Sequence, residues 1–234
     1  MTKILIPNSL PREEGDTFAL HRTGFTRVTD KDCLISELCQ SDLFNLISKA
    51  GPITDLQLLR SMFTQLCTAL HAMHQANLCH LDIKIDNVMV GADYLLRLAD
   101  FGFVTSTLLP INKMIGTKSS MAPEILNERR STYDGVKADI FSLGLILFIL
   151  YFGRPAFSQA DDSCKFWRSK QAKPSNFFRL HPTTRSLYKE GLIDADLMDL
   201  LIRMLSTDLT NERPSSIFEV MNHPFLTKHE VLDV

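Results

Sequence analysis

Apolar residues recur at spacings of three and four between residues 54 and 76, a pattern typical of an amphipathic helix with one buried face. Thr54 and Gln57 have the spacing of a capping box, which predicts that this helix begins at Thr54. A preceding helix is predicted from Ser41 to a stop at Gly51. The buried face of the longer helix is expected to comprise Leu56, Leu59, Phe63, Leu66, Leu70 and Met73.

Short apolar runs predict strands next to these helices. The run "CLISEL" at 33–38 predicts one strand, and "NVMV" and "YLLRLA" predict a hairpin that turns near Gly91 and Asp93. Residues 1–30 show no clear period and are interrupted by prolines and glycines, so we expect this segment to be irregular.

The second half of the chain is predicted to be almost wholly helical. Its most apolar stretch runs from Leu143 to Phe152, roughly half of the ~20 residues that a membrane span needs, and Asp139 and Arg154 bound it closely. We therefore expect a helix buried on all sides and no membrane span. A polar helix through "DADLMDLLIRMLS" and a last short helix that ends at Pro224 should follow.

Composition indicates an ordinary globular protein, because 45% of the 234 residues are hydrophobic and 22% are charged. The net charge of −2 comes from 25 basic and 27 acidic residues mixed along the chain, which excludes an extended basic surface for nucleic acid. The five cysteines are odd in number and widely spread, a pattern typical of reduced thiols. We therefore expect a cytoplasmic location, with the nucleus as an alternative.

The stretch "CHLDIKIDN" at 79–87 gathers polar side chains between a helix and the predicted hairpin. The hairpin should return the chain so that Asp100 approaches Asp82 and Asn87. Carboxylate and amide oxygens suit Mg²⁺, and Lys84 could neutralise a transferring phosphoryl group. Zinc is a less favoured alternative here, since His71, His74, Cys79 and His80 lack two well-separated ligand pairs.

In order and spacing, these residues resemble the catalytic segments of eukaryotic-type serine/threonine protein kinases, in which H-R-D-x-K-x-x-N is followed by D-F-G. The resemblance covers residues 33–226. The stretch "FSQADDSCKFWRSKQ" also resembles kinases that are abundant in ciliates. The residues that carry the match are His80, Asp82, Lys84, Asn87, Asp100, Phe101, Gly102, Gly116, Thr117, "MAPE" at 121–124, Asp139 and Arg213.

The resemblance implies a mainly α fold: the large C-terminal lobe of a kinase, with a small β-hairpin and a remnant of the small β lobe. Residues 1–40 would form this remnant and the hinge, residues 41–226 the large lobe, and residues 227–234 a tail. The implied activity is ATP-dependent phosphoryl transfer to serine or threonine hydroxyls, with ATP and Mg²⁺ as cofactors. The implied partner is a protein substrate or a regulated protein.

The resemblance also assigns roles to single residues. Asp82 would accept the substrate hydroxyl proton, and Lys84 would contact the γ-phosphate. Asn87 and Asp100 would hold Mg²⁺. The segment "SELCQ" at 36–40 resembles the hinge, whose backbone would meet adenine at Glu37 and Cys39.

Other matching residues would act as structural anchors. Glu124 and Arg213 correspond to a buried salt bridge, and Asp139 to an aspartate that accepts backbone hydrogen bonds from the 79–87 loop. The remaining anchors are His80, Phe101 and Gly102.

The chain also departs from the family pattern. No G-x-G-x-x-G loop precedes Cys33, and neither Lys3 nor Lys31 stands in a V-A-I-K-like strand. A charge-assisted hydrogen bond contributes on the order of 1.5–3 kcal/mol, so we expect ATP binding to be weakened by several powers of ten. Leu81 replaces the usual arginine, which argues against regulation by phosphorylation of the following loop.

Three interpretations follow from these residues. The intact catalytic series favours an active kinase. The missing loop and lysine favour a pseudokinase that binds or scaffolds a partner. A truncated product of a full kinase gene is the third.

Overall fold

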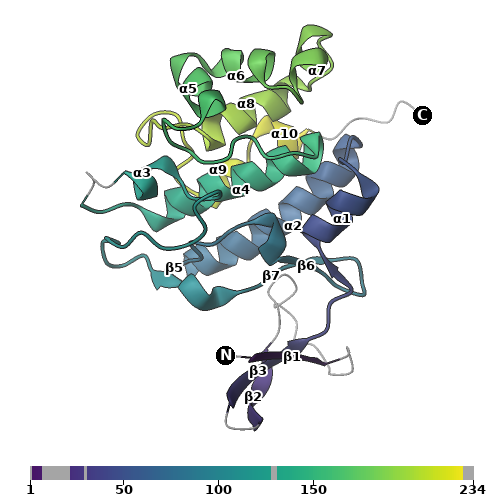
Figure 1. Cartoon of the computed structure of the whole chain (residues 1–234), viewed down its shortest axis with the longest axis vertical. Helices are drawn as coiled ribbons and strands as arrows, with labels where there is room; N and C mark the ends of the chain where they lie inside the picture. Colours follow the sequence, from purple (N-terminus) through teal and green to yellow (C-terminus); the bar gives the residue numbers. More distant parts are fainter. Residues whose placement is uncertain (1, 7–21, 29–30, 128–130, 229–234) are drawn as a thin grey trace.

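The computed structural model describes residues 2–6, 22–28, 31–127 and 131–228. Figure 1 shows a largely helical body with a small β-sheet at one end. In chain order the described elements are β1 (Thr2–Ile6), β2 (Arg22–Val28), β3 (Lys31–Glu37), β4 (Ser41–Asp42), α1 (Leu43–Ala50), α2 (Leu56–Gln75), β5 (Leu78–Cys79), η1 (Ile85–Asn87), β6 (Val88–Val90), β7 (Leu96–Leu98), η2 (Phe101–Phe103), β8 (Thr105–Ser106), α3 (Pro123–Leu126), α4 (Gly135–Phe152), α5 (Lys165–Ala172), α6 (Pro174–Leu180), α7 (Arg185–Lys189), α8 (Ala195–Met204), α9 (Ile217–Met221) and α10 (Pro224–Thr227).

The helix α1 ends at the predicted stop but starts at Leu43 and not at Ser41, because Ser41 and Asp42 form β4. Asp42 caps its start by accepting a hydrogen bond of 2.7 Å from the backbone N–H of Asn45. Gly51 ends the helix with a φ of 85°, in the region that glycine adopts readily.

The helix α2 confirms Leu59, Phe63, Leu66 and Leu70 as buried, with Leu56 and Met73 only partly buried, and it corrects the predicted start. The cap is Asp55 and not Thr54, because the Asp55 carboxylate accepts hydrogen bonds of 2.8 and 3.0 Å from the N–H groups of Gln57 and Leu58. A carboxylate also meets the positive end of the helix dipole, which favours it over a threonine hydroxyl.

The helix α4 is the apolar helix predicted around Asp139. It is the one described helix long and apolar enough to cross a membrane, and 83% of its apolar window is buried inside the molecule. It packs against α2 on one side and α8 on the other. Contact with neighbouring helices therefore accounts for its composition.

The predicted hairpin is formed by β6 and β7, which pair antiparallel with Val88 opposite Leu98. The short strand β4 extends this sheet, because Ser41 pairs with Val90. The chain that leaves β3 is thereby joined directly to the hairpin.

A second sheet has the strand order β1-β3-β2 and lies at one end of the molecule (Figure 1). The strand β3 confirms the strand predicted at 33–38. The expectation that residues 1–30 are irregular is wrong for β1 and β2, and both Lys3 and Lys31 lie in strands. Pairing with β3 defines these strands, and such partners leave little trace in the local pattern.

The last helices also correct one boundary. Pro224 was expected to end the final helix, but it begins α10, where a missing N–H costs nothing. His223 caps this helix by accepting a hydrogen bond from the N–H of Phe225 at 3.2 Å.

Candidate active site

A single carboxylate of α4 binds the backbone of the 79–87 loop. Asp139 is fully buried and accepts hydrogen bonds from the backbone N–H of His80 at 2.7 Å and of Leu81 at 2.8 Å. Its Oδ2 also lies 3.0 Å from Nε2 of His74 on α2. Leu81 takes a φ of 61°, and these bonds fix the loop in that uncommon conformation.

Three polar side chains of the loop meet at Asp82. Asn87 Nδ2 donates to Asp82 Oδ2 and to the Asp82 carbonyl, both at 2.9 Å. Lys84 Nζ lies 3.1 Å from the same Oδ2 and donates to Thr117 Oγ1 at 2.8 Å. Asp82 Oδ1 is buried and has no hydrogen-bond partner among the described residues. This oxygen is an acceptor available to an added group.

The surroundings of Asp82 favour its ionised form. Burial by itself raises the pKa of this carboxyl, but the nearby Thr117 hydroxyl, Lys84 and Asn87 outweigh burial and lower the pKa below its usual value. The carboxylate is therefore ionised at neutral pH.

The structure brings Asp100 beside this loop through the residues on either side of it. The Ala99 N–H donates to the Asn87 carbonyl at 2.9 Å, and His80 Nε2 lies 3.1 Å from the Ala99 carbonyl. The Phe101 ring packs on the His80 ring with centroids 5.4 Å apart. Asp100 itself is exposed and adopts a φ of 63°.

The oxygen atoms available at this loop are of the kind that Mg²⁺ prefers. Asn87 uses its Nδ2 on Asp82, which leaves the amide oxygen as an acceptor, and Asp100 adds an exposed carboxylate. No three His, Cys, Asp or Glu side chains of the described residues are placed to hold a metal ion. Protein ligands from Asn87 and Asp100 would thus need phosphate oxygens and water to complete the shell.

Three of the four side chains suggested as a zinc site, His74, Cys79 and His80, have other partners. His74 contacts Asp139 and His80 contacts the Ala99 carbonyl, as described above. Cys79 Sγ donates to the Thr105 carbonyl at 3.2 Å.

Glu37 and Cys39, which the sequence predicted at the hinge, have buried side chains. Glu37 Oε1 lies 2.5 Å from Arg97 Nε, and Cys39 Sγ lies 3.8 Å from the same oxygen. Burial and the Glu37 carboxylate raise the pKa of Cys39 to about 11, so the thiol stays protonated.

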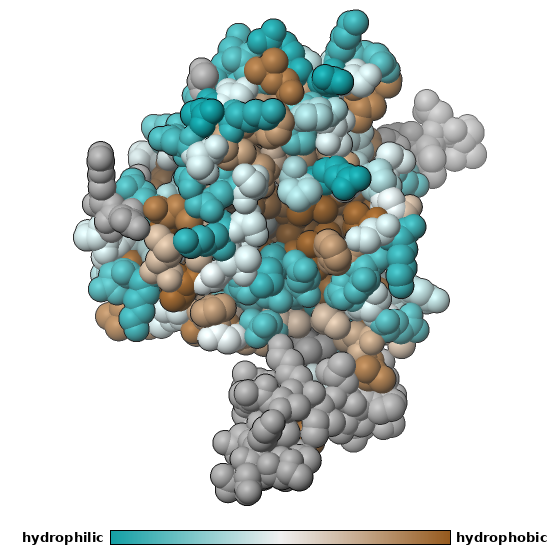
Figure 2. All heavy atoms as spheres, viewed as in Figure 1, coloured by the Kyte–Doolittle hydropathy of each residue, from teal (hydrophilic) through white to brown (hydrophobic). Residues whose placement is uncertain are grey.

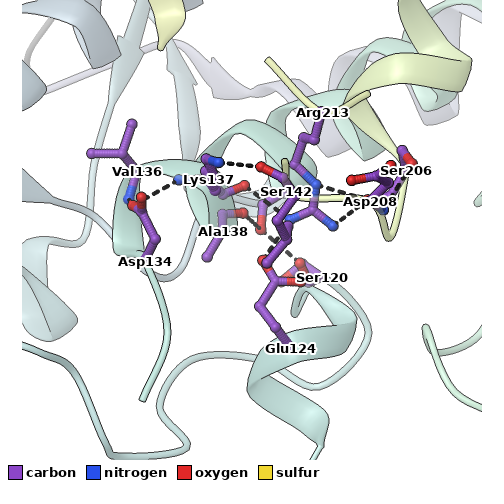
Figure 3. Close-up of polar contacts among 11 residues, drawn as sticks. Ser120, Glu124, Asp134, Val136, Lys137, Ala138, Ser142, Ser206, Asp208 and Arg213 are labelled. Carbon is purple, nitrogen blue, oxygen red and sulfur yellow. Dashed lines mark hydrogen bonds and ion pairs between the residues drawn. The ribbon is translucent and has the colours of Figure 1, made fainter. Parts of the chain in front are cut away.

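Glu124 and Arg213 form a buried ion pair near the start of α4 (Figure 3), where Arg213 Nη1 also donates to the Lys137 carbonyl. Arg213 Nη1 lies 2.5 Å from Glu124 Oε1, and Arg213 Nε donates to the Ser206 carbonyl at 2.8 Å. Ser142 donates to the Ser120 carbonyl at 2.7 Å and so ties α4 to the segment before α3.

A cavity of about 1090 Å³ opens next to the 79–87 loop, between α1 and the end of α4. Figure 2 shows a hollow there with hydrophobic residues on its floor and polar residues at its rim. The loop contributes Lys84, Asp86 and Asn87 to its lining, and α1 and α4 contribute apolar side chains such as Phe44 and Ile149.

The sequence did not predict the contacts of two residues, Thr117 and Arg97. Thr117 was noted as a motif residue, but its contact with Lys84 depends on a segment 33 residues away. Arg97 was included only in the apolar run of a strand, although it is 1% exposed and bound to two carboxylates. The presence of Asp93 four residues before an arginine in a buried strand was the available signal.

Comparison with known proteins supports one family. A family model described as "Protein kinase domain" matches residues 20–226. Testis-specific serine/threonine-protein kinase 3 of Homo sapiens is 31% identical over 94% of this chain and 80% of its own length. Sperm motility kinase 3A of Mus musculus is 31% identical over 83% of this chain and 36% of its own length. Serine/threonine-protein kinase SAPK1 of Oryza sativa is 29% identical over 80% of this chain and 53% of its own length.

The chain therefore spans about a third to a half of the last two relatives. The match to the family model extends over residues 36–40, the 79–87 loop, the Asp100 turn and the Glu124–Arg213 pair. This chain belongs to the protein kinase family, in its eukaryotic-type serine/threonine branch.

Proposed function

We propose that this chain transfers the γ-phosphoryl group of ATP to serine or threonine hydroxyls of a protein. The observation that carries the proposal is the Asp82 carboxylate, whose Oδ2 is engaged by Lys84 and Asn87 while Oδ1 is buried without a hydrogen-bond partner among the described residues. An ionised acceptor in this position can orient an incoming hydroxyl and take up its proton.

The remaining side chains have complementary roles in this proposal. Lys84 bridges Asp82 and Thr117, so its ammonium is held where negative charge on the transferring group would be stabilised. Asn87 and Asp100 would hold Mg²⁺, and the backbone at Glu37 and Cys39 would meet the adenine. When bound, Mg·ATP supplies the activated phosphoryl group.

We propose that the protein substrate lies along the cavity between α1 and α4. Continuity with the loop supports this position, because Lys84 and Asn87 line the same cavity. We also propose a cytoplasmic or nuclear location, since Cys39, Cys67, Cys79 and Cys164 are buried free thiols.

A second candidate function is a pseudokinase that binds or scaffolds a partner. The sequence before Cys33 favours it, because that segment has neither a G-x-G-x-x-G loop nor a V-A-I-K-like lysine. Fewer contacts to the phosphates should weaken ATP binding in either case.

Two measurements test the proposal. Isothermal titration with ATP, with and without Mg²⁺, should give weak, Mg²⁺-dependent binding. Transfer of radiolabel from ATP to casein should be detectable with the wild-type chain and lost in Asp82→Asn and in Asp100→Asn, with Asp162→Asn as an exposed control outside the loop.

The outcomes separate the two candidates. Binding without any transfer, or no binding at all, would favour the binding module. Submicromolar affinity for ATP would contradict the role given to the missing loop, and unchanged transfer in Asp100→Asn would contradict the metal role.

A further inference from the structure

Arg97 on β7 connects the end of the hinge strand to the β6–β7 hairpin from a position inside the molecule. Its Nε lies 2.5 Å from Glu37 Oε1, and its Nη1 and Nη2 donate to the two carboxylate oxygens of Asp93 at 2.9 and 2.8 Å. Nη1 also donates to the Leu95 carbonyl at 3.2 Å. The guanidinium thus binds two carboxylates at once, which a lysine ammonium cannot do with the same geometry.

The hairpin leaves room for this guanidinium at Gly91. A Cβ atom at this position would lie 2.0 Å from Arg97 Nη1 and 3.0 Å from Cζ. Any side chain at Gly91 would therefore have to displace the guanidinium.

The same segment of backbone is attached to the hairpin at a second point. Gln40 N–H donates to the Val90 carbonyl at 2.9 Å, directly before β4 pairs with β6. The hairpin thus binds the Glu37 side chain through Arg97 and the backbone of Gln40 through Val90. The Glu37 carboxylate is paired with Arg97 of the hairpin, so Glu37 can offer a ligand its backbone but not this side chain.

Arg97 also stands three residues before Asp100 on the same strand and turn. One side chain therefore joins the two stretches of backbone that, under the proposed function, would meet adenine and Mg²⁺. A binding site whose parts are fixed in advance loses less conformational freedom when the ligand binds.

We propose that Arg97 is a positioning residue for the nucleotide, acting through a clasp formed by Glu37, Arg97 and Asp93. The clasp sets the hinge backbone against the strand that leads to Asp100. This inference rests on the proposed function, because it needs a nucleotide that spans both segments.

The test compares nucleotide affinity, melting temperature and amide exchange in Arg97→Lys, Glu37→Gln and Gly91→Ala. Arg97→Lys keeps the positive charge but removes the planar guanidinium that binds two carboxylates. Gly91→Ala keeps Arg97 but places a methyl group where the guanidinium lies. Should Arg97→Lys fail to fold, Glu37→Gln keeps the shape of the hinge and the contact between Arg97 and Asp93. Leu200→Ala, in the fully buried face of α8, serves as a control that lowers stability elsewhere.

We expect the clasp variants to bind Mg·ATP about tenfold more weakly or worse, with faster amide exchange at residues 37–41. Leu200→Ala should melt at a lower temperature but keep wild-type affinity and wild-type exchange at 37–41. Wild-type affinity and exchange in the clasp variants would overturn the inference while the proposed function stands. A wild-type chain that does not bind Mg·ATP would overturn the proposed function, and the inference with it.

Discussion

The Arg213 guanidinium lies 2.5 Å from the Glu124 carboxylate, and both side chains are buried. Arg213 also donates to the Ser206 carbonyl and lies 4.9 Å from the centre of the Phe141 ring. One side chain thus connects α3, α4 and the segment after α8.

Glu124→Ala should strongly destabilise the protein, because it leaves the buried Arg213 charge without its carboxylate. The expected loss of unfolding free energy is about 3–5 kcal/mol. Urea unfolding of Arg203→Ala, which breaks the exposed Asp199–Arg203 pair and leaves the Asp199–His223 contact in place, should show a loss below about 1 kcal/mol. Equal losses in the two variants would contradict the role of burial.

Asp139→Asn should loosen the 79–87 loop, because the amide has one acceptor oxygen where the carboxylate has two. One of the N–H groups of His80 and Leu81 would lose its acceptor, at a cost of about 1–3 kcal/mol. Hydrogen exchange at these two amides and denaturation should report the change. Asp134→Asn, at the exposed cap of the same helix, should be nearly neutral, since asparagine caps equally well.

Lys170 should make the free energy of unfolding depend on pH in the alkaline range. Burial, followed by the nearby Arg213 charge, lowers the pKa of this lysine to about 8 from 10.5. Between these two pH values the unfolded chain binds a proton that the folded chain has lost, so this group raises the unfolding free energy as pH rises. The total change is at most about 3 kcal/mol.

Lys170→Met should therefore be more stable than wild type at pH 7, with a margin that shrinks between pH 8 and pH 10. Denaturation at several pH values measures the difference, and the exposed Lys165→Met on the same helix is the control. A margin that stays constant over this range would show that the ammonium is not desolvated.

Gly116→Ala should displace the 79–87 loop. Gly116 has a φ of 105°, and a Cβ there would lie 2.2 Å from the Leu81 carbonyl oxygen. Gly191 also has a positive φ of 68°, but a Cβ added there would meet no atom within 4 Å, so Gly191→Ala isolates the backbone cost. We expect Gly116→Ala to be less stable than this control by about 1–3 kcal/mol. Identical melting temperatures would contradict the clash.

Much of the helical body was predictable because its signals are local. The face of α2 follows from one period, and the hairpin at Gly91 follows from two apolar runs around a turn. The order of Asp82, Asn87 and Asp100 along the chain correctly predicted that the hairpin returns next to the 79–87 loop, since a tight hairpin permits little else.

Other features depend on contacts between distant residues and leave weak local patterns. The strands β1 and β2 are defined by pairing with β3, so no period of two marked them. Thr54 and Asp55 are both residue types that commonly cap helices, so the sequence alone could not decide which of the two caps α2. The burial of Arg97 requires Glu37, which lies 60 residues earlier and gives no signal at Arg97 itself.

The position of Asp139 on α4 has a consequence for heat and denaturants. Protein segments open locally with free energies that rise toward the best-packed elements, and α4 is the most enclosed helix among those described. The 79–87 loop is attached to this helix by two hydrogen bonds from backbone N–H groups to the Asp139 carboxylate, so we expect its opening to be coupled to that of α4. Partial unfolding should start at the distant β1–β3 sheet and reach the Asp82 carboxylate only with cooperative collapse of the helical body.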